Sequence, residues 1–150
     1  MRVFNGIDEV EKAVGEDLGR SEWMEITQER VNLFADATGD HQWIHVDPER
    51  AKDGPYGTTI AHGYLTLSLL PVLGAQIFSL EGVTMKVNYG ANKVRFPAPV
   101  PVGSRIRGGA EFKSFERTAK GANVVVAYTV EVEGSAKPAL VAETVVVLVP

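Results

Sequence analysis

Apolar residues between positions 27 and 38 recur with a helical spacing, and this is the clearest pattern in the chain. They stand at i, i+3 and i+4, at Val31, Phe34 and Ala35, which places them on one face of a helix. Thr27 is suited to cap the first turn, and Gly39 is suited to end the helix. The sequence therefore predicts an amphipathic helix over 27–38.

Three further helical segments are expected. Residues 8–18 form the first. Asp47 followed by Pro48 predicts a short helical turn, because Asp caps well and Pro is favoured at the first helical position. The third segment runs from about 62 to 80 and is apolar nearly all round, which is typical of a buried helix. We expect Pro71 to kink it.

After residue 82 the pattern changes to that of β-strands. Alternating or same-parity apolar residues stand at Val83, Met85, Val87, Tyr89, Ile106, Ala110 and Phe112. Val-rich runs follow at 124–132 and 140–149. Because no helix separates these strands, the sheet should be mainly antiparallel. A buried helix with such a sheet curved around it is an α+β architecture that resembles the hot-dog fold.

The composition is that expected for one globular domain spanning residues 1–150. Hydrophobic residues make up 45% of the chain and charged residues 23%, so the chain is not of the disordered class. The formal net charge of −4 argues against a general nucleic-acid partner. The absence of cysteine excludes disulfides, thiol nucleophiles and cysteine-ligated zinc.

Neither a signal peptide nor a membrane span is expected. The N-terminal residues carry acid early, at Asp8 and Glu9, and lack a long apolar stretch. The longest apolar stretch, 65–80, is interrupted by polar residues, by Pro71 and by Gly74. We therefore expect a cytoplasmic protein.

Asp40 and His45 lie five residues apart and are the most informative pair for chemistry. No helix or strand is expected between them, so both would lie on a connection, where functional residues are often found. A neutral imidazole accepts a proton near pH 7, and a nearby carboxylate can orient it or share the proton transfer. Aspartate is also common in turns and histidine on surfaces, so the spacing alone leaves a structural role open.

A longer motif surrounds this pair. The chain keeps five positions of the pattern Gly-Asp-x-Asn-Pro-aliphatic-His, followed by five residues and a small one: Gly39, Asp40, Ile44, His45 and Ala51. Gln42 stands in place of the Asn, and Trp43 in place of the Pro. Two landmarks follow, a small-His-Gly turn at 61–63 and a Phe-Pro-rich turn within 94–103.

With these three landmarks in this order, the chain resembles the MaoC-like dehydratases, the (R)-specific enoyl-CoA hydratases. With Gln42 and Trp43 at these two positions, the motif resembles that of an actinobacterial subgroup of 3-hydroxyacyl-thioester dehydratases. The resemblance implies the hot-dog fold and reversible hydration of a trans-2-enoyl thioester to the (R)-3-hydroxyacyl thioester, in fatty acid metabolism. It implies an acyl-CoA or acyl carrier protein thioester as the substrate and no cofactor.

The resemblance also implies three catalytic residues. His45 would be the principal base, and Asp40 would orient the water and deliver a proton. The Gly63 N–H would stabilise the thioester oxygen, since amides in the first turn of a helix lack internal partners. A metal site built from His41, His45 and Asp47 is not expected, because no helix pattern brings these side chains to one face.

Six residues are candidates for substrate binding: Ile60, Ala61, His62, Lys86, Phe96 and Pro97. His62 is more often a structural turn histidine, and Phe96 more often a core residue. Lys86 is a candidate for a CoA phosphate because of its charge, although basic residues on strands are usually only solvated.

Two other functions stay open at this point. Hot-dog thioesterases usually place a catalytic carboxylate on the buried helix, and 62–80 contains none. A non-catalytic acyl-binding dimer module would not need Asp40 or His45. Either way, the late strands would leave an exposed sheet edge, so we expect a homodimer.

Overall fold

The computed structural model describes residues 1–150. The strands are β1 Arg2–Asn5, β2 Asp17–Arg20, β3 Met24–Glu25, β4 Phe78–Glu81, β5 Met85–Arg95, β6 Arg105–Thr118, β7 Gly121–Val132 and β8 Leu140–Val149. The helices are α1 Ile7–Lys12, α2 Gln28–Thr38, α3 Trp43–Val46, α4 Pro48–Ala51, α5 Gly63–Ser68 and α6 Leu70–Ile77.

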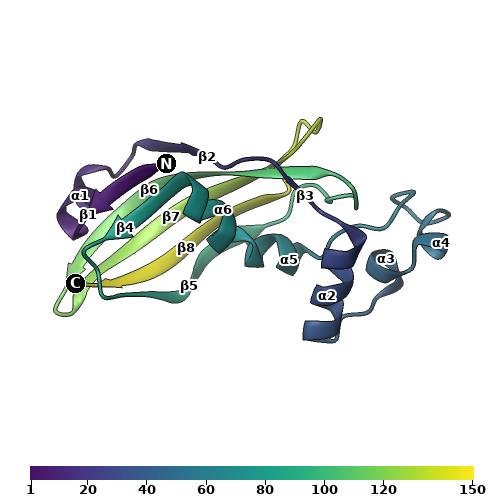
Figure 1. Ribbon diagram of the computed structural model, residues 1–150, viewed down its shortest axis with the longest axis horizontal. Coiled ribbons are helices and arrows are strands. Elements are labelled where there is room, and N and C mark those ends of the chain that lie inside the picture. The colour runs from purple at the N-terminus through teal and green to yellow at the C-terminus, as the bar shows by residue number, and fades with distance from the viewer.

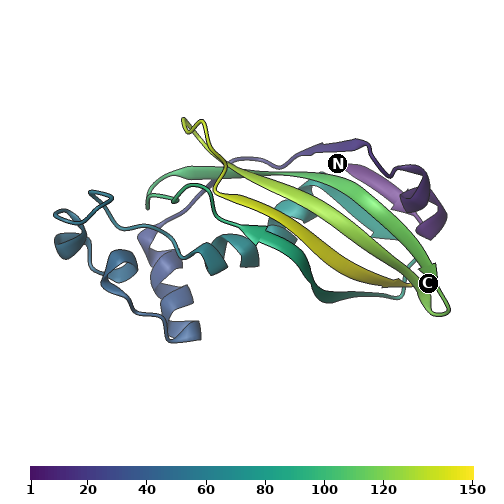
Figure 2. The same cartoon turned by 180° about the vertical axis from the view of Figure 1, so that it is seen from behind.

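The main sheet is antiparallel and has the order β2-β6-β7-β8-β5, with β3 also paired to β6. A small parallel pair, β1 and β4, stands apart from it. Helix α6 lies on one face of the main sheet, while α2, α3 and α4 gather beyond the strand ends and α5 lies between the two regions (Figure 1). Figure 2 shows the opposite face of the sheet, with α6 behind it. The predicted hot-dog arrangement is confirmed.

Helix α2 forms as predicted. Thr27 is its N-cap and accepts a hydrogen bond from the Arg30 N–H at 3.2 Å. Val31 and Ala35 are buried on the predicted face. Gly39 ends the helix with φ 83°, a left-handed conformation that side chains disfavour. The chain therefore leaves α2 in a fixed direction immediately before Asp40.

The long segment after His62 differs from the prediction in two ways. It is not one helix to residue 80 but two, α5 and α6, separated at Leu69, and Phe78 already begins β4. Pro71 lies in the first turn of α6, where its missing N–H costs no helical hydrogen bond. Nor is the segment buried all round, because Tyr64 and Val72 are exposed.

The prediction of a helix over 8–18 is wrong in its second half. Helix α1 ends at Lys12, and Leu18 lies in strand β2, where it is buried. Between them Gly15 takes φ 87°, which a helix cannot accommodate. The short strands β1, β3 and β4 were not predicted.

The core lies between α6 and the sheet. Leu73 of α6 is fully buried, and a Cβ on Gly108 of β6 would lie 3.1 Å from the Leu73 Cβ, so glycine permits this close approach. The predicted inward residues of β6, Ile106, Ala110 and Phe112, are all buried. The apolar residues predicted to alternate on β5, by contrast, are exposed at Met85, Val87 and Tyr89.

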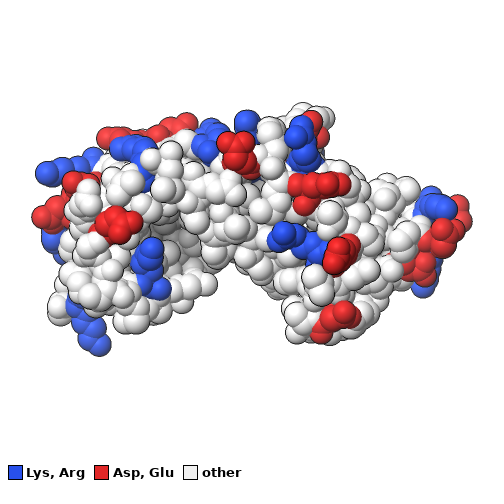
Figure 3. Space-filling view, viewed as in Figure 1, with Lys and Arg blue, Asp and Glu red and all other residues white.

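An open groove of about 710 Å³ lies beside α6, between this helix and strands β5, β7 and β8. Its lining is mainly apolar and includes Pro71, Phe78, Val126, Tyr128 and Val146. In Figure 3 the left part of the molecule is hollowed and its walls are mostly uncharged. Among the helices, none is both long and apolar enough to cross a membrane.

Candidate active site

The site is built where the chain leaves α2 and meets the turn that begins α5. The sequence prediction of a connection without secondary structure is wrong for His45, which lies in the short helix α3. The Ile60 N–H donates to the Ile44 carbonyl at 3.0 Å and holds the two segments together. The Ala61 N–H donates to the Val100 carbonyl at 2.8 Å and ties this turn to the segment after β5.

His45 is buried, with 7% of its surface exposed. Its Nδ1 lies 2.7 Å from the Ile60 carbonyl oxygen. Because a carbonyl only accepts, Nδ1 carries a hydrogen, and in the neutral ring Nε2 has the free lone pair. Burial lowers the pKa of His45, helped by the nearby His62 and opposed by the Ile60 hydrogen bond and the charge of Asp40. A neutral imidazole with one free nitrogen is suited to accept a proton.

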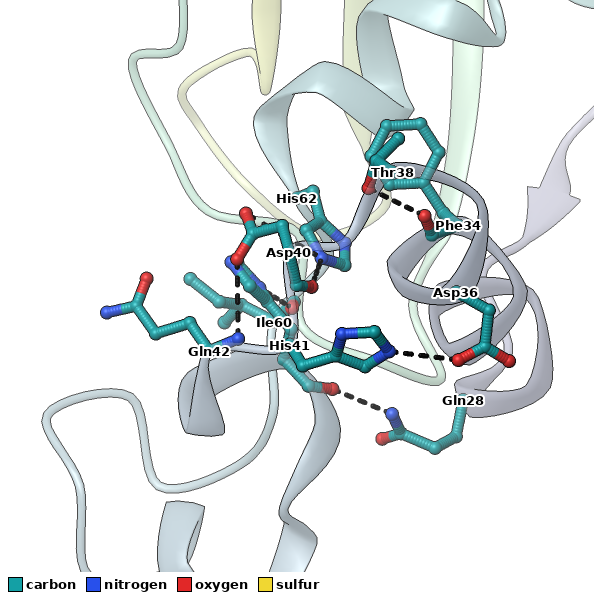
Figure 4. Close-up of polar contacts among 10 residues, drawn as sticks. Gln28, Phe34, Asp36, Thr38, Asp40, His41, Gln42, Ile60 and His62 are labelled. Atoms are coloured by element: carbon teal, nitrogen blue, oxygen red, sulfur yellow. Dashed lines mark hydrogen bonds and ion pairs between the residues drawn. The ribbon is translucent and has the colours of Figure 1, made fainter.

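Asp40 and His62, which lie side by side in Figure 4, complete a three-residue cluster with His45. The possible ligand atoms of these residues all lie within 4.8 Å of one another. The His62 Nε2 lies 3.0 Å from the Asp40 carbonyl oxygen and 4.0 Å from the carboxylate Oδ2. The Asp40 side chain is 51% exposed, whereas His62 is 2% exposed. The cluster thus places a solvated carboxylate beside a buried imidazole.

This cluster, rather than His41, His45 and Asp47, has the spacing of a metal site. The His62 Nε2 carries a hydrogen to bond the Asp40 carbonyl, so this nitrogen is not available to a metal. A metal ligand needs that nitrogen free. The arrangement fits proton transfer better than metal binding.

A cavity of about 330 Å³ opens beside His45. Five sequence-predicted residues line it with His45: Ile60, Ala61, Gly63, Phe96 and Pro97. Gly63 is the first residue of α5, so its N–H has no partner within the helix. His62 lies behind the cavity, stacked on His45, rather than in its lining. Within one chain, Lys86 does not belong to this cavity, because it lines the groove beside α6.

Sequence reasoning missed the side chains that anchor the His45 segment. Gln28 donates from Nε2 to the His45 carbonyl at 2.7 Å, and its Oε1 accepts from the Thr59 hydroxyl at 2.6 Å. Thr66 and Tyr56 also line the cavity. Gln28 lies 17 residues before His45 and Thr59 lies 31 after Gln28, so no local pattern could indicate these contacts.

Residues 9–134 match the protein family described as MaoC like domain. The chain is 60% identical to 3-hydroxyacyl-thioester dehydratase Z of Mycobacterium tuberculosis, over 97% of each chain. Among solved structures, it is similar to an (R)-hydratase from A. caviae involved in PHA biosynthesis, with a TM-score of 0.72, 25% identity, and coverage of 89% of this chain and 94% of that one. A monoamine oxidase regulatory protein from Archaeoglobus fulgius has the same fold, with a TM-score of 0.80, 23% identity, and coverage of 100% and 99%.

Proposed function

Because this chain belongs to the MaoC-like domain family, we propose that it is a hydro-lyase that reversibly adds water to trans-2-enoyl thioesters in fatty acid metabolism. The product is the (R)-3-hydroxyacyl thioester, and the substrate is carried by CoA or acyl carrier protein. One observation supports this most directly. A buried imidazole with a free Nε2 lies beside a carboxylate, at a cavity that also contains the first amide of a helix.

In the proposed mechanism, Asp40 and His45 hold one water between them. The His45 Nε2 accepts a proton from this water as its oxygen bonds to C3 of the substrate. His45 passes the accepted proton to the Asp40 carboxylate, which delivers it to C2, so the net change adds OH to C3 and H to C2. Both groups are then back in their starting states, and the pair acts as one acid–base unit.

The thioester oxygen gains negative charge as C3 is attacked. The Gly63 N–H is the proposed donor, because it lies in the wall of the cavity and lacks a partner within α5. Phe96 lies over Gly63, and a Cβ added there would come within 3.1 Å of the Phe96 ring. The absence of a side chain at Gly63 therefore lets the Phe96 ring pack closely against it.

The groove beside α6 is the proposed site of the acyl chain, because its lining is mainly apolar and includes Leu67 and Ser68 of α5, the helix that contains Gly63. Helices α5 and α6 contain no Asp or Glu. Glu81 lies at the end of β4 instead. The carboxylate that hot-dog thioesterases usually place on this helix is therefore missing, which supports hydration over hydrolysis.

The direct test is incubation of the purified protein with crotonyl-CoA and with longer trans-2-enoyl-CoAs. Loss of the conjugated enoyl-thioester absorbance, with formation of the (R)-3-hydroxy product, is the expected result. Unchanged absorbance for every chain length would refute hydration. Release of free CoA thiol would identify a thioesterase instead.

The pH dependence of kcat/KM should report His45. Activity should fall as the pH drops, because protonated Nε2 cannot accept the proton of water. Since burial lowers the pKa of His45, the midpoint of this fall should lie below the ordinary value of 6.5. Measurement with crotonyl-CoA between about pH 5 and pH 8 covers the range in which histidine titrates. A midpoint above 6.5 would contradict the assignment of His45 as the base.

We predict a homodimer joined through β5. This strand is at the edge of the main sheet, with its second edge unpaired, and exposes Met85, Val87 and Tyr89. Tyr89 is the most exposed of the three, at 76%. The variant Tyr89→Lys should weaken the dimer, whereas Leu33→Lys, on the exposed face of α2, should not. Light scattering at micromolar concentration decides this, and a wild-type monomer would refute it.

The assignment of residues 1–150 to one domain and the cytoplasmic location stay predictions.

A further inference from the structure

His62 is held between two rings. One face stacks on His45, with the ring centroids 3.9 Å apart and the planes at 25°. The Phe34 ring of α2 lies against it at 5.0 Å, tilted by 58°. At the ring edge, Nε2–H donates to the Asp40 carbonyl at 3.0 Å (Figure 4). One side chain therefore contacts both members of the proposed acid–base pair.

We propose that His62 is a positioning residue. Its hydrogen bond fixes the position of Asp40, and its ring fixes the position of His45 and shields it from water. The two contacts come from different parts of the same side chain. The hydrogen bond acts on the backbone of Asp40, in a segment that leaves α2 without further secondary structure. The stacking covers one face of His45, which limits its access to water.

A histidine that only fills the core would not need this arrangement. The Nδ1 of His62 is buried and has no hydrogen-bond partner. An apolar ring would fill the same space without leaving a buried polar atom unpartnered. The feature that a phenyl ring cannot replace is the Nε2–H on the Asp40 carbonyl. The Nε2–H of His62 is therefore explained by Asp40 rather than by packing.

Two substitutions separate these contacts. His62→Phe keeps a ring beside His45 and removes the donor to Asp40. His62→Gln keeps a donor near the position of Nε2 and removes the ring. The matched control is His41→Phe, because His41 is exposed and its ring nitrogen bonds Asp36 rather than the site.

In hydration of crotonyl-CoA, His62→Phe should lower kcat by roughly 10- to 100-fold with little change in KM, the scale expected for an acid–base group displaced by about 1 Å. His62→Gln should lose less kcat. His41→Phe should stay within about twofold of wild type, a difference of about 0.4 kcal/mol in barrier. Because thermal unfolding is followed on the same samples, kcat refers to folded protein. A lower melting temperature with normal kcat in His62→Phe would reduce His62 to a packing residue and overturn the proposal.

Because kcat rests on the proposed function, the second readout does not depend on activity. NMR titration of the His45 ring gives the midpoint of its protonation directly. The ionisable groups near His45 are Asp40, His62 and Tyr56, which lines the same cavity. Both variants remove the charge of His62, which helps to lower the pKa of His45. Only in His62→Gln does water also reach the uncovered face, so the His45 midpoint should rise toward 6.5 by more there than in His62→Phe.

An unchanged His45 midpoint in His62→Gln overturns the proposal, whether or not His62→Phe folds. If the wild-type protein fails to hydrate any enoyl-CoA, the proposed function fails. The NMR titration then still decides whether His62 controls the environment of His45. The two failures are therefore distinguishable.

Discussion

Replacing Asp40 with Asn, or His45 with Ala, should each lower kcat for hydration by roughly 10²–10⁴-fold, the usual contribution of a positioned acid–base group. Asp40→Asn removes the charge while keeping a side chain of the same shape. His45→Ala removes the only ring nitrogen with a free lone pair in the wall of the cavity. Measurement of kcat and KM with crotonyl-CoA tests both variants.

The double variant should be little worse than either single one, because the two groups act on the same water. Folding should be retained, since Asp40 is half exposed and its carbonyl still accepts from His62. Circular dichroism and light scattering check this. His41→Gln is the control, because it changes an exposed neighbour bonded to Asp36. Activity within about tenfold of wild type in both single variants, about 1.4 kcal/mol in barrier, would rule out the proposed mechanism.

The pair itself could be predicted because its members are close in sequence. Asp40 and His45 are separated by four residues, and Gly39 stops α2 immediately before them. The turn at 61–63 and the residues Phe96 and Pro97 could be added by resemblance. Their meeting with His45 depends on long-range backbone hydrogen bonds, such as that from Ala61 to the Val100 carbonyl. The local sequence pattern does not indicate such bonds.

Lys86 lines the groove beside α6 rather than the cavity, and the sequence could not indicate this placement. Lys86 stands on the same strand as Arg95 but near its opposite end, and an 11-residue strand spans about 36 Å. Charge alone could not indicate which end lies near the cavity. The tautomer of His45 was likewise not predictable, since it depends on the Ile60 carbonyl, 15 residues away.

For the fold, the central strands were predictable and the edge was not. Residues of β6 alternate between a buried and a more exposed face, so Ile106, Ala110 and Phe112 show the period of two. Strand β5 has the same kind of alternation in sequence, yet both of its faces are exposed in the single chain. An apolar pattern predicts that side chains are buried but does not identify what covers them. For β5 the predicted partner is a second copy of the chain.

The prediction that the helix continues to residue 80 is a different kind of error. The run from Leu65 to Leu80 is apolar nearly throughout, so composition alone continues one helix. Short apolar segments do not distinguish helix from strand by periodicity. Phe78 to Glu81 become a strand because β1, at the far N-terminus, pairs with them. That pairing is tertiary and overrides the local preference.

Gly63→Val should lower kcat by roughly 10²–10³-fold, the usual loss when one oxyanion donor is removed. The new side chain would lie beside the N–H and block approach of the thioester oxygen. A glycine kept for an unusual backbone angle is excluded here, because Gly63 is not among the glycines with positive φ. Helix propensity does not worsen on leaving glycine, so α5 should be retained.

The effect of Phe96 must be separated from that of the amide, since a Cβ at Gly63 would lie 3.1 Å from the Phe96 ring. We therefore compare Gly63→Ala and Gly63→Val in the wild type and in a Phe96→Ala background. If the substitutions act only by displacing Phe96, they should cost nothing further in that background. If they block the amide, the loss of kcat should persist there, with the melting temperature nearly unchanged, because the N–H is approached from the cavity whether or not the ring is present. Normal kcat for Gly63→Val in the Phe96→Ala background would remove the Gly63 amide from the proposed mechanism.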